Sequence, residues 1–84
     1  MKKEIKLYTL PYCPYSKGTK KLLDERGLEY IDIDLFRHDE IRYQLQTKTH
    51  SYTVPFIFIG DKFIGGYSEL KELDSCGELK ELLK

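Results

Sequence analysis

The spacing of apolar residues along the chain predicts an alternation of strands and helices. Apolar and polar residues alternate in segments 5–9 and 30–35, as they do in half-buried strands. Between these segments the apolar residues recur at helical spacing. We therefore predict a helix that begins at Pro14, where the fixed φ of proline suits the first helical position, and that ends before Gly27. Cys13 then takes the N-cap position of this helix.

The second half of the chain continues this alternation. The continuously apolar run 55–59 indicates a central strand buried on both faces, and after a turn the segment 62–64 returns as a fourth strand. Helical spacing predicts a short helix over 38–48, before this hairpin. After it, Ser68 is predicted to cap a third helix, and the sequence at 75–78 has the form of a capping box before a last helical stretch.

This order of elements predicts an α/β fold. The first strand, helix and second strand form a βαβ unit, in which the strands are parallel and the crossover is right-handed. The turn between the last two strands makes that pair antiparallel. The expected architecture is a four-stranded mixed sheet with helices on both faces, in one domain that spans residues 1–84.

The composition excludes several classes of protein. Hydrophobic residues make up 40% and charged residues 33% of the chain, which is a globular rather than a disordered balance. No apolar run approaches the ~18 residues of a membrane helix, and the first residues do not resemble a signal peptide. We therefore expect a cytoplasmic protein without a membrane partner. The net charge of zero argues against a nucleic-acid partner, and we expect a monomer.

The two cysteines, Cys13 and Cys76, lie far apart in the sequence. A disulfide between them is not expected in a reducing compartment. Together with His38 and His50 they lack the paired spacing of a zinc site. No metal site built from protein ligands alone is therefore expected.

The candidate chemistry begins at Cys13. At a helix N-terminus, unpaired backbone N–H groups and the helix dipole stabilise a negatively charged thiolate, and Lys17 adds a positive charge nearby. Ser16 lies one helical turn further on the same face, where a cysteine could resolve a mixed disulfide formed at Cys13. A serine cannot form a disulfide, so an external thiol must clear such an adduct. The alternative is an inert buried thiol, although the flanking prolines favour an exposed loop.

Two further segments carry signals that are weaker by themselves. The position of Pro55 before an apolar strand is explained either by a cis Val54–Pro55 bond or by a trans proline that opens the strand. Gly65 and Gly66, before a helix, are either a plain turn or a place where the backbone approaches a ligand. In the second case the N–H groups at the start of that helix would face an anion.

Together, these segments closely resemble the glutaredoxin family. The resemblance rests on Cys13-Pro14-Tyr15-Ser16, on Thr53-Val54-Pro55 and on Gly65-Gly66-Tyr67-Ser68, in the order and at the spacing of the family. It extends over nearly the whole chain, from about residue 5 to residue 83. It implies a thioredoxin-like fold with a cis proline bond beside the thiol, and a groove for glutathione.

The resemblance also implies roles for individual residues. Cys13 is the nucleophile, Tyr15 lines the site, and Ser16 stands where this branch of the family usually has a resolving cysteine. Arg42 falls where the family places a residue for the glycyl carboxylate of glutathione. The backbone of Val54 pairs with the cysteinyl unit like an added strand. The residues implied in glutathione binding are Tyr15, Arg42, Thr53, Val54, Pro55, Gly66, Tyr67, Ser68 and Glu69.

Besides Ser16, two positions depart from the pattern of the family. The family often has a lysine three residues before the nucleophile, where this chain has Leu10. We expect a lysine at this position to tighten glutathione binding through an exposed charge pair. Glu69 replaces the usual aspartate, and in the family this residue and Ser68 receive the γ-glutamyl carboxylate.

The main interpretation is an enzyme, a glutathione-dependent thiol–disulfide oxidoreductase that acts on glutathionylated proteins or small mixed disulfides. Glutathione is then a co-substrate, and no cofactor is bound permanently. An alternative is a carrier, because some monothiol glutaredoxins bind an iron–sulfur cluster between two subunits, usually through a Cys-Gly-Phe-Ser motif. A third interpretation is a thioredoxin-like electron donor reduced by a flavoprotein. Ser16 argues against it, because such donors need two thiols.

Overall fold

The computed structural model describes residues 3–83, and its elements follow the predicted order, with the C-terminal helical region divided into two helices. The elements are β1 (Ile5–Thr9), α1 (Pro14–Glu25), β2 (Ile31–Asp34), α2 (Asp39–Thr49), β3 (Phe56–Ile59), β4 (Lys62–Gly65), α3 (Tyr67–Cys76) and α4 (Glu78–Leu82). None of the helices within these residues is long and apolar enough to span a membrane.

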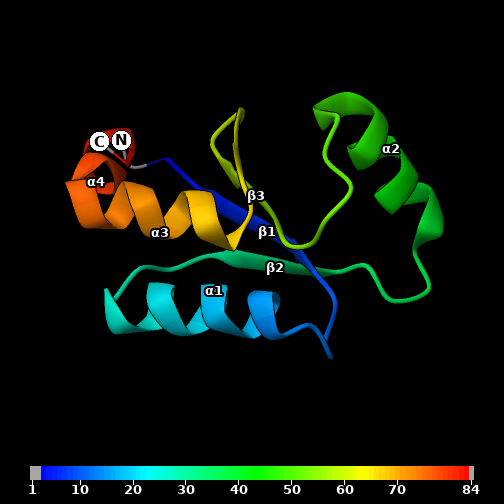
Figure 1. Cartoon of the computed structure of the whole chain (residues 1–84), viewed down its shortest axis with the longest axis horizontal. Coiled ribbons are helices and arrows are strands. Elements are labelled where there is room, and N and C mark those ends of the chain that lie inside the picture. The colour runs from blue at the N-terminus through cyan, green and yellow to red at the C-terminus, as the bar shows by residue number, and fades with distance from the viewer. Residues whose placement is uncertain (1–2, 84) are drawn as a thin grey trace.

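The strands form one mixed sheet in the order β2-β1-β3-β4. β1 is parallel to β2, whereas β3 is antiparallel to both β1 and β4. Helices α1 and α3 run side by side and begin at the same end of the molecule, and α2 lies apart from them (Figure 1). The predicted four-stranded mixed sheet with flanking helices is confirmed.

The side chains of the central strand β3 alternate between two apolar clusters, one on each face of the sheet. Ile57 and Ile59 pack with residues of α1, α3 and α4, while Phe56 and Phe58 pack with a residue of α2. All four are buried, as predicted for a strand covered on both faces. The first cluster consists of Ile5, Leu7, Leu23, Ile57, Ile59, Leu70 and Leu79, and the second of Leu10, Leu35, Leu45, Phe56 and Phe58.

The start of α3 differs from the prediction that Ser68 caps it. The N-cap is Gly66, and Ser68 lies exposed in the first turn. The Gly66 N–H donates a hydrogen bond to Glu69 Oε1 at 2.7 Å, which is the half of a capping box that needs no side chain at the N-cap. The helix therefore begins earlier than predicted, and the side chain that satisfies a backbone donor at its start is that of Glu69 at position N3.

The capping box predicted at 75–78 is also wrong. Residue 75 is still inside α3, where Ser75 Oγ donates to the carbonyl of Lys71 at 2.9 Å instead of capping the next helix. Gly77 follows with a left-handed φ of 83°, which ends α3 and begins α4. A positive φ is accessible to glycine without steric cost, so this residue, rather than Ser75, makes the corner.

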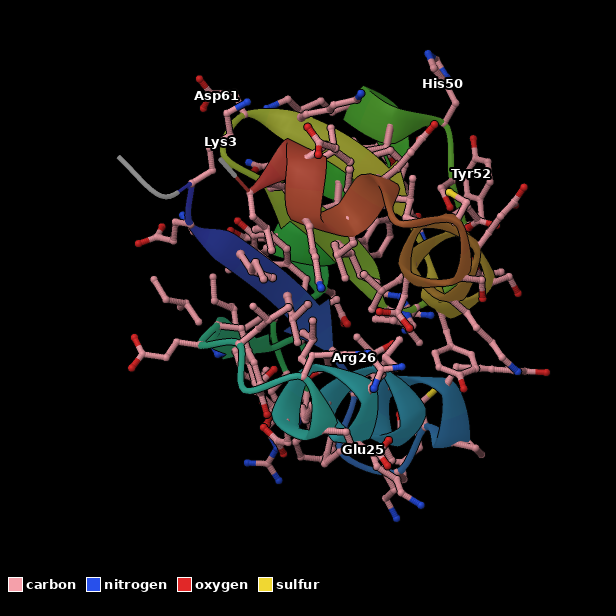
Figure 2. The ribbon with its side chains drawn as sticks, turned by 90° about the vertical axis from the view of Figure 1, so that its left-hand side faces the viewer. Lys3, Glu25, Arg26, His50, Tyr52 and Asp61 are labelled. Carbon is pink, nitrogen blue, oxygen red and sulfur yellow. The ribbon has the colours of Figure 1, made fainter. Side chains whose placement is uncertain are left out.

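An exposed ion pair joins the end of α1 to α3. Arg26 Nε and Nη2 each donate to one carboxylate oxygen of Asp74, both at 2.9 Å. Figure 2 shows the Arg26 side chain between the two helices. The hydrogen bond from Arg26 lowers the pKa of the Asp74 carboxyl in the folded protein below its usual range. Folding therefore favours the ionised form of Asp74.

We predict that this pair stabilises the fold at neutral pH and that the stabilisation is lost in acid. A depressed pKa in the folded state contributes stability above the ordinary value of 3.8, and this contribution is lost as the pH falls through the lower folded value. Asp74→Asn should therefore lower the free energy of unfolding at pH 7, and the difference from the wild type should shrink below pH 3.8. Denaturant unfolding at several pH values measures this. The matched control is Asp61→Asn, an exposed aspartate on the β3–β4 turn (Figure 2). A difference that stays constant down to acid pH would contradict the role of the carboxylate.

Candidate active site

Three loops meet at one edge of the sheet. Because β3 is antiparallel to both neighbours, its first residue, Phe56, pairs with Tyr8 near the end of β1. Its next residue, Ile57, pairs with Gly65 at the end of β4. The loop that follows β1 carries Cys13, so this thiol, the segment before β3 and the start of α3 lie together. The topology alone therefore gathers the three sequence motifs.

Cys13 is the N-cap of α1, as predicted, with φ −87° and ψ 122°. Its N–H donates to the Leu10 carbonyl at 3.2 Å, and its carbonyl accepts from the Lys17 N–H at 3.1 Å. Pro14 follows at the first helical position. The thiol is half-buried against the second apolar cluster, whereas Lys17 is exposed. The residue therefore has hydrocarbon on one side and the open end of a helix on the other.

A polar network ties α1 to the sheet just before the Cys13 loop. The buried hydroxyl of Thr9 donates to Asp32 Oδ1 at 2.6 Å, and Lys20 Nζ lies 2.6 Å from Asp32 Oδ2. Thr9 is the last residue of β1, Asp32 lies on β2 and Lys20 on α1. The three elements that surround the start of the loop are therefore held by one carboxylate.

Ser16 is buried, with 1% of its surface exposed. Its Oγ accepts a hydrogen bond from the Leu10 N–H at 3.4 Å. A second bond joins the Cys13 N–H to the Leu10 carbonyl. The backbone of Leu10 is therefore bonded to both Ser16 and Cys13. The serine therefore fills the position of a resolving thiol and satisfies a backbone donor of the loop.

The segment before β3 contains a cis Val54–Pro55 peptide bond. Of the two explanations that the sequence allowed, the structure confirms the one that the family resemblance implied. Val54 packs on the same apolar cluster as Cys13, Pro55 is fully buried, and Thr53 is exposed. A Cβ placed on Gly66 would lie 3.5 Å from the Pro55 carbonyl oxygen, so the start of α3 is in contact with this segment.

Gly65 and Glu69 define the approach to α3. Gly65 has a φ of +121°, and a Cβ there would lie 2.7 Å from both Cγ and Oε1 of Glu69. Only glycine suits both the conformation and the space. The Glu69 carboxylate consequently folds back onto the Gly66 N–H, while Ser68 next to it stays exposed. In the first turn of a helix the N–H groups lack intrahelical partners, so this end of α3 attracts anions.

Two tyrosines lie between the starts of α1 and α3. The rings of Tyr15 and Tyr67 have their centroids 6.3 Å apart and are tilted by 38°. Tyr15 is 61% exposed, which leaves most of its ring available to a ligand. Lys71 Nζ lies 6.0 Å from the centroid of the Tyr67 ring. The predicted site residues on the two helices therefore face one another beside Cys13.

Arg42 lies on α2, where it is half-buried. Its neighbour Ile41 packs on the apolar cluster that also contacts Cys13, so the thiol and this turn of α2 share a cluster. Neither Arg42 nor Lys17 forms an ion pair within residues 3–83. Both charges are thus available to an anionic ligand.

The structure corrects the expectation for Leu10. We had expected position 10 to be an exposed place for a cation, but Leu10 is 6% exposed and belongs to the second apolar cluster. A lysine here would have to bury its ammonium or displace the loop, so the exposed charge pair that we expected cannot form without disturbing the core. No local pattern predicts this burial, because a leucine in a loop next to a proline has no periodic spacing.

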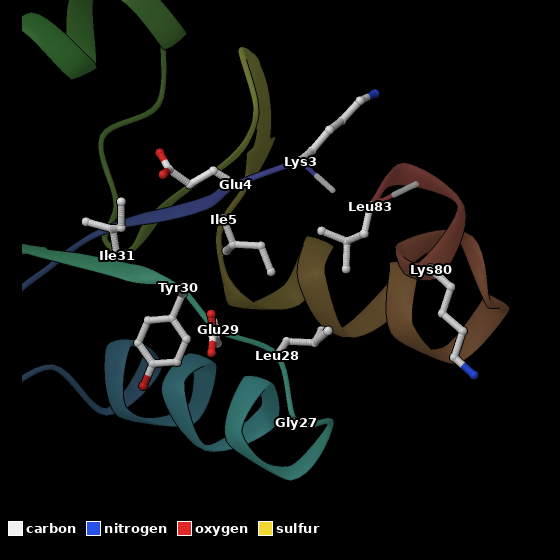
Figure 3. Close-up of a pocket in the computed structure, with 10 residues that line it drawn as sticks. All are labelled: Lys3, Glu4, Ile5, Gly27, Leu28, Glu29, Tyr30, Ile31, Lys80 and Leu83. Atoms are coloured by element: carbon white, nitrogen blue, oxygen red, sulfur yellow. The ribbon is translucent and has the colours of Figure 1, made fainter. Parts of the chain in front are cut away.

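Two pockets of residues 3–83 lie away from the Cys13 loop, although Glu69 at the start of α3 lines the smaller one. The larger, of about 730 Å³, opens between the start of β1 and the end of α4, with Ile5, Leu28 and Leu83 on its apolar side (Figure 3). Burial, reinforced by Asp24, raises the pKa of the Tyr30 hydroxyl at its rim, so this tyrosine is neutral. No cluster of metal-ligating side chains occurs within residues 3–83.

The second pocket, of about 360 Å³, lies between β4 and α3 and contains Cys76. This thiol is exposed and unpaired, and it lies at the end of α3 that is remote from the start of α1 (Figure 1). Glu69, Glu72 and Glu78 also line the pocket. Their charges disfavour an anionic ligand, so Cys76 lacks the environment that surrounds Cys13.

Known proteins share this architecture and sequence. The glutaredoxin family model matches residues 5–64, which include the Cys13 loop and the cis proline. A glutaredoxin of Pseudomonas aeruginosa is 38% identical over 77 residues, which cover 92% of this chain and 92% of the relative. The chain belongs to the glutaredoxin family. The predicted class of enzyme, an oxidoreductase that acts on glutathione, is thereby confirmed.

Solved glutaredoxins match the fold in detail. The structure of a buckwheat glutaredoxin–glutathione complex is similar with a TM-score of 0.92 and 34% identity, over 96% of this chain and 76% of that one. This similarity confirms the thioredoxin-like fold. A protein described as an uncharacterised monothiol glutaredoxin of Caenorhabditis elegans is 32% identical over 88 residues, which cover 100% of this chain and 60% of the relative.

We predict that Leu10→Lys destabilises this glutaredoxin. The substitution removes a buried leucine, which costs about 2–5 kcal/mol in comparable truncations, and places a charge against the second apolar cluster. Denaturant unfolding measures the change, with Leu10→Met as the control that keeps the volume and costs less than about 1.5 kcal/mol. A lysine variant with wild-type stability and tighter glutathione binding would restore the earlier expectation for this position.

Proposed function

We propose that this glutaredoxin removes glutathione from mixed disulfides by a monothiol mechanism, with Cys13 as the only reacting thiol of the protein. The substrates are glutathionylated proteins or small glutathione mixed disulfides, and glutathione is the co-substrate. No permanently bound cofactor takes part. The observation that carries the proposal is the half-buried Cys13 thiol at the N-cap of α1 with Ser16, not a cysteine, one helical turn away.

The reaction proceeds by two thiol–disulfide exchanges. In the first, the Cys13 thiolate attacks the glutathione sulfur of the mixed disulfide. A bond forms between Cys13 and glutathione, and the substrate leaves as a thiolate that takes up a proton. In the second, the thiolate of another glutathione attacks the bound glutathione sulfur, glutathione disulfide leaves, and the Cys13 thiolate is restored. In total, the mixed disulfide and one free glutathione become the substrate thiol and glutathione disulfide, and Cys13 is regenerated.

The surroundings of Cys13 favour the first step. Cys13 lies at the N-terminus of α1, and the N-terminus of α3 lies at the same edge of the sheet, so the positive ends of two helix dipoles face this region. Lys17 is exposed and has no ion-pair partner among residues 3–83. Glutathione carries a net negative charge, so these groups favour its approach.

The proposed glutathione groove runs from Arg42 past Cys13 to the start of α3. Arg42 would bind the glycyl carboxylate. The backbone of Val54, with Thr53 and Pro55 on either side, would pair with the cysteinyl unit as an added strand does. The N–H groups of Ser68 and Glu69 would receive the γ-glutamyl carboxylate at the helix start. The remaining proposed contacts are Tyr15, Gly66 and Tyr67.

The proposal fits a monomer in a reducing, cytoplasmic environment, where Cys13 stays a thiol. Iron–sulfur cluster carriage stays an alternative prediction of the resemblance, since it uses the same cysteine and glutathione. Anaerobic reconstitution with iron, sulfide and glutathione separates the two functions. A brown protein that elutes as a dimer supports the carrier, and a colourless monomer supports the oxidoreductase.

We predict that Cys13→Ser abolishes thiol transfer while the fold stays intact. A hydroxyl at the N-cap keeps the local geometry and suits this position, but it cannot form a disulfide. Activity on a glutathionylated peptide in an assay coupled to glutathione reductase measures the loss, and circular dichroism checks the fold. The control is Cys76→Ser, which should keep wild-type activity. Substantial activity in the Cys13 variant would assign the reaction to another group.

We also predict a long-lived adduct between Cys13 and glutathione after treatment with glutathione disulfide. Ser16 cannot displace the glutathione, so only an external thiol clears it. Intact-mass and peptide-mass analysis after removal of excess reagent should locate one glutathione on the Cys13 peptide. In Ser16→Cys the adduct should collapse to an internal disulfide. A Cys13–Cys76 disulfide in the wild type would overturn the monothiol mechanism.

A further inference from the structure

Gly18 lies in the interior of α1, where glycine is unfavourable. It is four residues beyond Pro14 and well before the end of the helix at Glu25. Its φ is not positive, so the backbone conformation does not require glycine. Glycine weakens a helix interior relative to alanine because it loses more backbone freedom on folding. The reason for a glycine here must therefore lie in what packs against it.

The ring of Tyr67 occupies the space that a side chain on Gly18 would need. A Cβ on Gly18 would lie 3.3 Å from Cε1, 3.3 Å from Cζ and 3.6 Å from Cδ1 of Tyr67. These ring atoms are its three nearest neighbours, and two of them lie inside the ordinary carbon–carbon contact distance of about 3.5–4.0 Å. An alanine would thus push this one ring by a few tenths of an ångström.

Besides Gly18, the Tyr67 ring has Lys71 and Tyr15 as neighbours. Lys71, one helical turn further along α3, places its ammonium 6.0 Å from the ring centroid. Tyr15 lies 6.3 Å away and is the second residue after Cys13. Tyr67 also follows Gly66 directly, which lies against the Pro55 carbonyl. A displacement of the ring away from α1 is therefore felt at the start of α3 and at Tyr15.

We propose that Gly18 is a positioning residue for glutathione recognition. Its missing side chain lets Tyr67 lie against α1, and this contact sets the spacing of the two tyrosine rings that flank the groove beside Cys13. The inference rests on the proposed function, because it assigns Tyr15 and Tyr67 to the glutathione groove. Gly18 does not act on the thiol itself, so its role is confined to binding.

Gly18→Ala separates this role from a merely structural one. Alanine is the better helix former, so the stability of the variant to denaturant should be equal to or higher than that of the wild type. The KM for a glutathionylated peptide should nevertheless rise several-fold, with kcat almost unchanged. The rate at which iodoacetamide alkylates Cys13 should not change, because this reagent does not use the groove. The matched control is Lys21→Ala, an exposed position on the same helix, which should leave the KM unchanged.

A double-mutant cycle tests whether the effect passes through Tyr67. Tyr67→Ala removes the ring that Gly18 accommodates, so adding Gly18→Ala to this variant should not raise the KM further. An equal rise in both backgrounds would mean that Gly18 acts through another contact, and the proposal would be wrong. An active wild type with an unchanged KM in Gly18→Ala would overturn this inference alone. A wild type that does not form the Cys13–glutathione adduct would overturn the proposed function and this inference with it.

Discussion

Strand β3 is antiparallel to both of its neighbours, and this pairing decides where the loops of the site can lie. Both β1 and β4 end where β3 begins. The Cys13 loop, which follows β1, and the start of α3, which follows β4, therefore reach the same edge from opposite sides of β3. The strand can take this central position because all four of its residues are apolar and buried. Ile57 and Ile59 serve one face, and Phe56 and Phe58 the other. A polar residue in this strand would weaken the apolar layer that it faces and, with it, the meeting of the loops.

Features that depend on local patterns were predictable from the sequence. The alternation in β1, the helical spacing in α1 and the apolar run of β3 predicted these elements close to their observed bounds. Pro14 and Gly27 correctly bracketed α1, because each residue has a conformational preference that acts without tertiary contacts. The N-cap position of Cys13 followed from the same preference of proline.

Features that depend on residues distant in the sequence were not predictable. Leu10 is buried in the apolar cluster that also contains Leu45 of α2, and no local pattern reveals that cluster. The importance of Gly18 depends on Tyr67, which is brought against α1 by the packing of α3. The one sequence signal for this role was a glycine inside an otherwise regular helix. Glycine is a poor helix former, and nothing in the neighbouring sequence explains it. The cap of α3 differs from the prediction because Glu69, at position N3, bonds the Gly66 N–H and the helix starts there, before Ser68.

The environment of Cys13 combines apolar packing with the polar start of a helix. The thiol packs on an apolar cluster, which shields it from water, and yet it is the N-cap of a helix whose backbone donors stabilise negative charge. Ser16 supports this arrangement from inside the fold, because its hydroxyl accepts a hydrogen bond from the backbone at the start of the loop. The residue at the resolving position thus has a structural role that does not need a second thiol.

The two thiols of the chain show that exposure alone does not determine reactivity toward an anion. Cys76 is the more exposed, but it lies at the C-terminal end of α3, where the helix dipole is negative, in a pocket that is also lined by glutamates. Cys13 is less exposed, being half-buried, but it lies at the positive end of α1. The positive end of α3 lies at the same edge of the sheet. Charged groups act over about 8–10 Å at physiological ionic strength, so each thiol experiences mainly its own end of the molecule. Because α1 and α3 run in the same direction, the positive termini of these two helices lie at the end with Cys13 and their negative termini at the end with Cys76. The fold itself therefore places the two cysteines in electrostatically different surroundings.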